Sequence, residues 1–429
     1  MENKKNYTIP IIVMILLFGM ISFVTNLASP MGDILKNQFN IPNWQGTLGV
    51  FANFIAYAVM GIPAGNLLQK RGYKKTALVA VVVGFIGVGI QTLSGVFGSF
   101  GIYLLGAFVA GFSMCLLNTV VNPMLNKLGG GGNKGNQLIQ IGGTFNSLCG
   151  TAVIIITGLL IPSILDAKIS DVFPLMYTAL GIFAFAFLVI LLTKIPENEQ
   201  QTVVKQVEKG KGPMAFRHFV LGAIAIFIYV GVEVGIPNVL NKWLQNPELN
   251  VLGAGVNAEA VAGSVAATYW FLMLIGRLVG GIIGNKVSAK AMLTVVSVVG
   301  IILTLLAMFG PQTMVKFPAF NGAHGFGMEN IPLNAAFLVC IGLCTSVMWG
   351  GIFNLAVEGL GKYTEKASGI FMALVCGGGI LPLLQNAIVD GLGGTGYLQS
   401  YWVIVGGLAF LLFYALWGSK NVNKDIPVD

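Results

Sequence analysis

The stretch GIPAGNLLQKRGYKKTAL, residues 61–78, aligns without gaps on the stretch GRLVGGIIGNKVSAKAML, residues 276–293. Each copy ends an apolar segment with glycines four residues apart, crosses a short basic loop, and opens the next apolar segment. A looser match pairs residues 122–129 with residues 354–361. Because the two matches recur in the same order, the sequence predicts a chain made of two related halves.

The composition around this repeat is that of a membrane protein. Of the 429 residues, 55% are hydrophobic and only 9% are charged, whereas about 25% of the residues of a soluble domain are charged. Soluble and disordered proteins are therefore excluded. Hydropathy marks twelve apolar segments, and one membrane helix needs about 20 such residues. Since a spanning segment must satisfy its own backbone hydrogen bonds, we expect an all-α membrane protein with twelve transmembrane helices in two pseudo-symmetric six-helix bundles.

The positive charges predict how the chain is oriented. Nineteen of the 24 Lys and Arg residues lie in loops on the amino-terminal side of the segments, and Arg277 is placed at a helix end on that side. Such loops face the cytoplasm, so we expect both termini there, in a multi-pass protein of a bacterial cytoplasmic membrane. The run from Ile9 lacks a small-residue cleavage site and is interpreted as a first membrane helix rather than a signal peptide. The net charge of +8 then needs no nucleic-acid partner.

A long stretch of mixed charge separates the two halves. We expect an N-terminal six-helix bundle at residues 1–194, a cytoplasmic linker at 195–217, and a C-terminal six-helix bundle at 218–429. A second polar loop, residues 311–330, is expected outside the membrane and is assigned no chemistry. The five cysteines lie inside apolar runs without metal or disulfide spacing, so we expect no metal and no cofactor.

Two acidic residues lie deep within apolar segments and are the first candidates for function. Asp33 falls in the first segment and Glu233 near the middle of the seventh. A carboxylate at the centre of a bilayer costs about 2.5–3.5 kcal/mol on insertion scales, and it usually faces a cavity or a partner. We therefore predict that Asp33 and Glu233 bind a proton or the substrate. The alternative is that neighbouring helices merely satisfy each carboxylate.

Amide and aromatic side chains extend this candidate site. Asn118, Asn122 and Asn126 recur at every fourth residue and share one helix face. Such amides either join helices or line a hydrated cavity, and a cavity with both donors and acceptors suits a neutral polyol such as a sugar. An anionic substrate would need Arg or Lys at this depth, and none is expected there. Trp270 and Trp349 lie near the middle of their segments, where they either stack on a sugar ring or face lipid and core. The predicted substrate-binding residues are Asp33, Asn118, Asn122, Gln140, Asn146, Glu233, Trp270, Trp349 and Asn354.

The basic loop of the first repeat resembles the signature between helices two and three of the major facilitator superfamily. That signature usually carries Asp where this chain has Gln69, so we expect a weaker latch on the cytoplasmic side. A plain excess of positive charge on that side is the alternative. Arg277 and Glu358 are both expected at the cytoplasmic end of the second half, as an ion pair or part of the latch rather than as substrate contacts. The predicted latch residues are Gly65, Gln69, Lys70, Arg71, Gly72, Arg277 and Glu358.

Seven short matches, in the same order along both halves, resemble the fucose–galactose–glucose:proton symporter family of that superfamily. They are Asp33 to Phe39, Asn122-Pro123 with Leu128-Gly129, Thr144 to Ser147, Tyr229 to Gly231, Ile275 to Arg277, Ile352-Phe353 with Leu360-Gly361, and Gly377 to Ile380 with Pro382. The resemblance implies that Asp33 is a proton and sugar site. The family's proton-coupling Glu of helix four is matched by Asn118, which cannot titrate, and a helix-five Gln is matched by Gly143. Glu233 is a candidate to replace the missing carboxylate.

We therefore expect a secondary active transporter of a monosaccharide of the fucose, galactose or glucose type. It would work by alternating access as a monomeric proton symporter, with the lipid bilayer, a sugar and a proton as its only partners. Two alternatives remain open: a sugar uniporter, and a proton antiporter that exports another small solute. An enzyme or receptor is not expected, because the sequence offers no nucleophile with its base and no appended domain.

Overall fold

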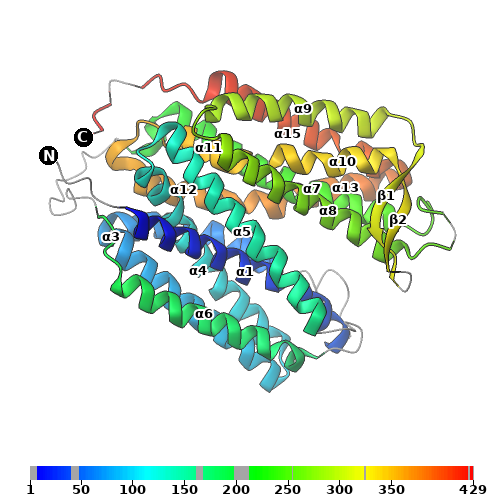
Figure 1. Cartoon of the computed structure of the whole chain (residues 1–429), viewed down its shortest axis with the longest axis horizontal. Coiled ribbons are helices and arrows are strands. Elements are labelled where there is room, and N and C mark those ends of the chain that lie inside the picture. Colours follow the sequence, from blue (N-terminus) through cyan, green and yellow to red (C-terminus); the bar gives the residue numbers. More distant parts are fainter. Residues whose placement is uncertain are drawn as a thin grey trace. The chain divides into compact units, whose positions relative to one another are not determined.

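The computed structural model describes residues 7–39, 48–160, 168–197, 212–253, 255–322, 325–423 and 426–428. The chain is almost entirely helical and divides into two compact units (Figure 1). The first unit consists of Met1–Val220, Val357–Cys376 and Asn421–Asp429, and the second of Leu221–Ala356 and Gly377–Lys420. A segment from the second half of the sequence thus packs within the first unit. Most of the predicted linker, residues 198–211, lies outside the described residues.

The first unit is a bundle in which α1 packs along α5, and α3 packs against α4 and α6. Ser99 caps α4, because its hydroxyl oxygen accepts a hydrogen bond from the Ile102 amide. The helices of this unit are α1 (Thr8–Phe39), α3 (Leu48–Phe97), α4 (Phe100–Leu128), α5 (Gly132–Leu160), α6 (Phe173–Leu192) and α12 (Thr364–Ala373), with short 3-10 helices at Ile169–Val172, Pro213–Ala215, Gly361–Tyr363 and Leu374–Cys376.

One glycine divides α3 into two membrane spans. Gly72 has φ 78° and ψ 176° inside an otherwise helical run, a conformation that only glycine adopts without strain. The chain therefore turns at Gly72, and the second span starts with Tyr73. Lys70 and Arg71, just before the turn, are exposed. We call the end of the first unit that carries Lys70, Arg71, Lys74 and Lys75 the basic end.

The second unit contains the remaining spans and a small sheet. Its α7 and α13 contain Pro237 and Pro382, and α10 and α11 are separated by a turn at Ser346 and Val347. A 3-10 helix at Gly393–Thr395 precedes α14, and a π-helical turn at Tyr414–Gly418 follows α15. The helices are α7 (Arg217–Gln245), α8 (Ala258–Ile283), α9 (Ala289–Phe309), α10 (Leu333–Thr345), α11 (Met348–Val357), α13 (Gly377–Leu392), α14 (Gly396–Gln399) and α15 (Trp402–Phe413).

The polar loop at residues 311–330 contains most of a β-hairpin between α9 and α10 (Figure 1). Strands β1 (Met314–Phe320) and β2 (Phe326–Pro332) pair antiparallel, and the Phe320 amide donates to Ser264 Oγ of α8 at 3.0 Å. Among the described residues, this hairpin is the one sheet in an otherwise helical chain. A seven-residue strand can form here because it lies outside the apolar segments, where backbone groups can bond to water.

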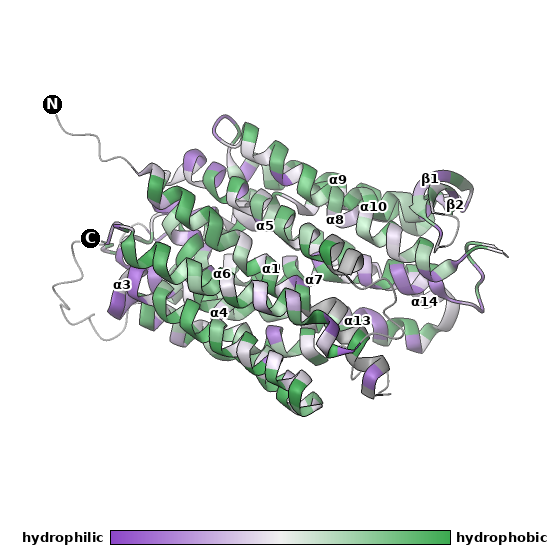
Figure 2. Ribbon diagram, turned by 60° about the horizontal axis from the view of Figure 1, so that its bottom comes forward, coloured by the Kyte–Doolittle hydropathy of each residue, from purple (hydrophilic) through white to green (hydrophobic). Residues whose placement is uncertain are grey.

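The described residues account for the twelve predicted spans. Nine helical stretches among them are long and apolar enough to cross a membrane. One of these, α3, contributes two spans because of the turn at Gly72, while α5 and the shorter stretch Trp402–Gly418 supply the other two. Hydrophobic residues cover the bodies of α4 and α6, and hydrophilic residues gather near helix ends (Figure 2). The apolar bodies of the helices therefore face lipid or the cores of the units.

Glycines hold α12 close to α3 at the basic end. A Cβ atom added at Gly65 of α3 would lie 2.9 Å from the Cα of Gly369 in α12. A Cβ atom at Gly369 would in turn lie 2.5 Å from the carbonyl oxygen of Gly61. Small residues spaced by four let two helix backbones approach in this way. The glycine spacing seen in the sequence is therefore used for the docking of α12.

We predict that Gly65→Val lowers the free energy of unfolding in detergent by about 1–3 kcal/mol more than Gly89→Val does, because overpacking a tight contact costs about this much. Gly89 lies in the same helix, and a Cβ atom there would meet nothing within 4 Å. Thermal or denaturant unfolding of both variants checks the prediction. Equal stability of the two variants would contradict the close approach of α3 and α12.

Candidate functional site

A buried chain of amides runs along α4 in the first unit. Asn118 is 5% exposed and Asn122 is fully buried. Asn118 Nδ2 donates to the Tyr57 hydroxyl of α3 at 2.7 Å, and Asn122 Nδ2 donates to the backbone carbonyl oxygen of Asn118 at 2.9 Å. Pro123 follows in the same helix. The predicted amide face therefore exists, and its inward position is fixed by a tyrosine that the sequence analysis did not single out.

The amides of α5 lie on the neighbouring helix of the same unit. Gln140 is 2% exposed, and its backbone carbonyl oxygen accepts a hydrogen bond from Thr144 Oγ1 at 3.0 Å. Asn146 is partly buried and donates from Nδ2 to the Phe18 carbonyl oxygen of α1 at 2.7 Å. Asn146 thus joins α1 to α5. Asp33 belongs to α1, but its side chain lies outside the part of the chain that the structure describes.

Two further polar residues of α1 face α5 and were missed by the sequence analysis. Asn26 Nδ2 donates to Ser22 Oγ at 2.9 Å, and Ser22 is 6% exposed. A Cβ atom at Gly150 of α5 would lie 2.5 Å from Ser22 Oγ, so this polar pair sits directly against the α5 backbone. The spacing of four residues between Ser22 and Asn26 was the available signal.

In the second unit, Glu233 of α7 forms an ion pair with Arg277 of α8. Arg277 Nη2 lies 3.2 Å from Glu233 Oε1, and both side chains are 11% exposed. Glu233 and Arg277 each lie well inside a membrane-spanning helix. The pair brings two opposite charges together in an apolar bundle, so the site holds a donor and an acceptor with no net charge.

This ion pair corrects the partner expected for Arg277. From the sequence, Arg277 was expected at the end of its helix, where it and Glu358 would form an ion pair or part of the latch. In the structure, α8 continues to Ile283, which places Arg277 nearly two turns inside it. Glu358 belongs to the first unit, its side chain is exposed, and its carbonyl oxygen contacts His218 Nε2 at 2.9 Å. A basic group is therefore present at the depth of Glu233, contrary to the expectation.

Aromatic rings surround the ion pair. Tyr229 lies one turn before Glu233 on α7, and its ring packs edge-on against Trp349 with 6.4 Å between centroids. On α8, Tyr269 packs edge-on against Trp270 at 5.4 Å, and its hydroxyl lies 2.9 Å from Thr345 Oγ1. Trp270 is 37% exposed, and Trp349 is partly exposed. Both tryptophans thus keep accessible ring surface beside buried tyrosines.

Further amide side chains lie in the membrane-spanning helices of the second unit. Asn354 of α11 is 5% exposed. Gln385 of α13 is fully buried, and neither of its side-chain amide atoms has a hydrogen-bond partner among the described residues. Asn386, its neighbour, accepts from Lys242 Nζ at 2.7 Å and donates to Asn238 Oδ1 at 3.2 Å. Gln385 and Asn386 were not among the predicted site residues, although amide side chains within an apolar segment indicate a candidate polar site.

Of the predicted latch residues, Gly65, Gln69, Lys70, Arg71 and Gly72 lie at or next to the basic end of the first unit, whereas Arg277 lies inside α8 of the second unit. The carboxylates that contact the basic loop come from other parts of the first unit. Glu197 accepts from the backbone amides of Tyr73 and Lys74 at 2.8 Å each, which stabilises the start of a helix. Glu365 of α12 is 5% exposed and accepts from the Tyr73 hydroxyl at 3.2 Å. Lys127 Nζ lies 5.8 Å from the centre of the Tyr73 ring. The carboxylates of Glu197 and Glu365 thus provide the negative charge at this loop that the neutral side chain of Gln69 lacks.

The chemistry available at these sites is hydrogen bonding and charge pairing. Among the described residues, no group of three or more His, Cys, Asp and Glu side chains could hold a metal ion. The first unit offers amide donors and acceptors, and the second offers a neutral ion pair with aromatic rings. Such groups bind and orient a polar solute, and nothing in them resembles a nucleophile with a neighbouring base.

The family model of the Major Facilitator Superfamily matches residues 11–383. The chain is 28% identical over 427 residues to the glucose/galactose transporter of Brucella abortus (strain 2308), covering 98% of this chain and 96% of the relative. It is 29% identical to a putative glucose/galactose transporter of Helicobacter pylori (strain J99), covering 99% of this chain and 100% of the relative. The L-fucose-proton symporter of Escherichia coli (strain K12) is 23% identical, with 91% and 89% covered.

The fold is similar to that of solved transporter structures. A crystal structure of the major facilitator superfamily transporter FucP in the outward conformation matches with a TM-score of 0.80 and 20% sequence identity, covering 97% of this chain and 100% of that chain. The proton:xylose symporter XylE matches with a TM-score of 0.68 and 16% identity, covering 95% and 94%. The predicted fold class is thereby confirmed.

We predict that Arg277→Gln and Glu233→Gln each destabilise the protein by about 3–5 kcal/mol, because removing one partner leaves the other charge buried alone. The double variant should recover most of that loss, since it leaves no unpaired charge. A double-mutant cycle on unfolding in detergent measures the coupling. Additive losses in the double variant would show that the two groups do not interact.

We predict that Glu365→Gln increases the rate at which a maleimide modifies Cys376 by about three- to tenfold. The substitution weakens the bond from Tyr73 that holds α12, and Cys376 directly follows α12 in the same unit. Glu358→Gln is the control, because Glu358 is exposed. Peptide mass spectrometry follows each cysteine separately. If both variants react at the same rate, Glu365 does not hold α12.

Proposed function

The chain belongs to the major facilitator superfamily, whose members are transporters rather than enzymes, and we propose that it carries a neutral monosaccharide across a bacterial cytoplasmic membrane by alternating access. The relatives named as glucose/galactose transporters and as L-fucose-proton symporters support a hexose as the cargo. The excess of Lys and Arg in the loops on the amino-terminal side supports an orientation with both termini in the cytoplasm.

The observation that carries the proposal is the balance of polar groups. Buried amides of the first unit, Asn118, Asn122 and Gln140, offer both donors and acceptors. In the second unit, the ion pair of Glu233 with Arg277, at 3.2 Å, has no net charge. A hexose carries hydroxyl groups that donate and accept, so it suits such groups better than an anion or a lipophilic compound does.

Aromatic side chains add a surface for the ring of the sugar. Trp270 and Trp349 keep exposed ring area, and an aromatic face packs on the apolar C–H face of a sugar. In our proposal the amides and the ion pair select the hydroxyl pattern, and one tryptophan stacks on the ring. Asn146 and Asn354 are assigned to the same set of substrate contacts.

We further propose that proton binding to Asp33 couples sugar uptake to the membrane potential. The potential supplies about 2.3 kcal/mol per charge per 100 mV, which is enough for more than tenfold accumulation. Glu233 is the candidate for the second carboxylate, since Asn118 cannot titrate. A proton on Glu233 would leave the Arg277 charge without its partner, so we assign protonation of Glu233 only to a state in which Arg277 has found another acceptor.

The latch at the basic end fits a transporter that must close one side while the other is open. The contacts of Gly65 with Gly369 and of Tyr73 with Glu365 fasten α12 to α3. In our proposal they break and re-form once per transport cycle. The residues of the latch are therefore expected to set the rate of transport rather than the choice of sugar.

We predict that proteoliposomes containing the protein accumulate D-glucose, D-galactose or L-fucose more than tenfold when an inward proton gradient is imposed. Asp33→Asn should abolish accumulation but keep exchange of labelled for unlabelled sugar, because exchange needs no net proton movement. Asp171→Asn, at an exposed site in the first unit, is the control. Uptake that ignores the gradient would make the protein a uniporter, and uptake of none of the sugars would overturn the proposal.

A further inference from the structure

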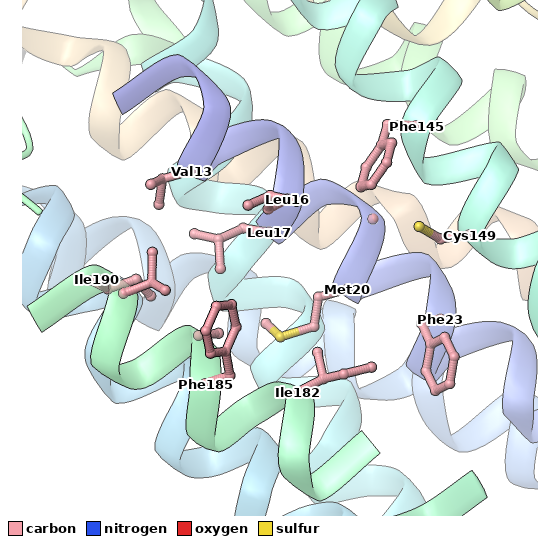
Figure 3. A pocket seen from close by; sticks show the side chains of 13 residues that line it. Val13, Leu16, Leu17, Met20, Phe23, Phe145, Cys149, Ile182, Phe185 and Ile190 are labelled. Carbon is pink, nitrogen blue, oxygen red and sulfur yellow. The ribbon is translucent and has the colours of Figure 1, made fainter. Parts of the chain in front are cut away.

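A groove on the flank of the first unit is built entirely from apolar side chains. It lies between α1, α5 and α6 and has a volume of about 220 Å³. Leu17 and Met20 of α1, Phe145 and Cys149 of α5, and Phe185 and Ala186 of α6 are among the residues that line it. Figure 3 shows these helices around a space that carbon and sulfur atoms surround. No residue proposed above to bind sugar lines it.

The groove exists because α1 sits close to α5 and leaves room beside α6. A Cβ atom at Gly19 of α1 would lie 2.5 Å from the ring of Phe145, and Asn146 bonds to the Phe18 carbonyl oxygen. On the side facing α6, the small side chain of Ala186 leaves space between the two helices. The gap is therefore a consequence of helix packing that α5 fixes.

The lining decides what kind of molecule can fill the groove. A water or sugar there would lose its hydrogen bonds, because the lining side chains offer none. Hydrocarbon loses nothing in such surroundings. The outer face of α6 already presents large apolar side chains, with Phe185 65% exposed and Leu188 55% exposed, so this flank faces lipid tails. An acyl chain can enter the groove directly from the bilayer.

Positive charge lies at one mouth of the groove. Ile190 lines the groove, α6 ends at Leu192, and exposed Lys194 lies two residues beyond that end. Lys74 Nζ also lies here, donating to the carbonyl oxygens of Leu191 and Thr193 at 2.8 and 2.9 Å. A phospholipid whose acyl chain fills the groove would bring its phosphate to these two lysines.

We propose that this groove is a binding site for a phospholipid with an anionic headgroup from the cytoplasmic leaflet. The acyl chain lies between α1 and α6, and the phosphate contacts Lys194 and Lys74. Such a lipid braces α1 against α6, on the side of α1 where the groove leaves a gap between the two helices. The site goes beyond the proposed sugar transport and does not depend on which solute is carried.

Filling the groove tests the site. We expect purified protein mixed with phosphatidylglycerol to retain one lipid in native mass spectrometry, and Ala186→Trp to reduce the retained fraction about tenfold. Ala184→Trp is the matched control, because Ala184 is exposed on the same helix and does not line the groove. Lys194→Gln should reduce the preference for phosphatidylglycerol over phosphatidylcholine. Equal retention in both tryptophan variants overturns the proposal.

Native cysteines report where the lipid binds. Phosphatidylglycerol should slow the reaction of Cys149 with N-ethylmaleimide at least fivefold, because Cys149 lines the groove. The rate at Cys340, a partly exposed cysteine of the second unit, should not change. The protection of Cys149 should be lost in Ala186→Trp. Equal slowing at both cysteines, or protection that persists in Ala186→Trp, places the lipid elsewhere and overturns the proposal. Failure of sugar uptake leaves both readouts unaffected.

Discussion

The 3.2 Å contact between Arg277 and Glu233 is the interaction on which the chemistry of the second unit depends. Neither charge could remain inside a membrane-spanning bundle alone, because a buried charge without a partner is strongly destabilising. The pair therefore fixes the relative rotation of α7 and α8, and with it the positions of Tyr229 and Tyr269. Trp349 and Trp270, which we assign to sugar binding, pack against these two tyrosines. Their positions therefore also depend on the ion pair.

The same constraint explains how the first unit is organised. Several of its buried polar side chains bond to one another or to nearby carbonyl oxygens, as in the contacts of Asn118 with Tyr57 and of Asn146 with Phe18. Where helices need to come closest, the sequence uses glycine, as at Gly65 and Gly369. Apolar surface remains only on the flanks, and one flank carries the groove that we assign to lipid. Polar side chains thus occur where hydrogen-bond partners are near, glycines where two helices approach closely, and apolar side chains on the flanks.

Much of this architecture could be predicted from the sequence, and the exceptions have physical causes. Long apolar segments identify the spans, and the spacing of Asn118 and Asn122 identifies a polar face. The partner of Arg277 was wrong because Arg277 was counted as a charge at a helix end, although six residues of its helix follow it, about 9 Å along the axis. The hairpin was missed although Asn321-Gly322 between two alternating stretches is a turn signal, because the loop was judged by its polarity alone.

The contact of α12 with the first unit could not have been predicted from local sequence. Glycines in α3 indicate that some helix approaches closely, but not which one. Glu365 replaces the missing acid of the basic loop from nearly 300 residues away, and only the folded chain brings it to Tyr73.

The central claim is that these units bind a neutral hexose, and equilibrium dialysis of purified protein against labelled sugars tests it most directly. We expect saturable binding of D-glucose, D-galactose or L-fucose and none of gluconate, whereas binding of gluconate or of no hexose would contradict the account.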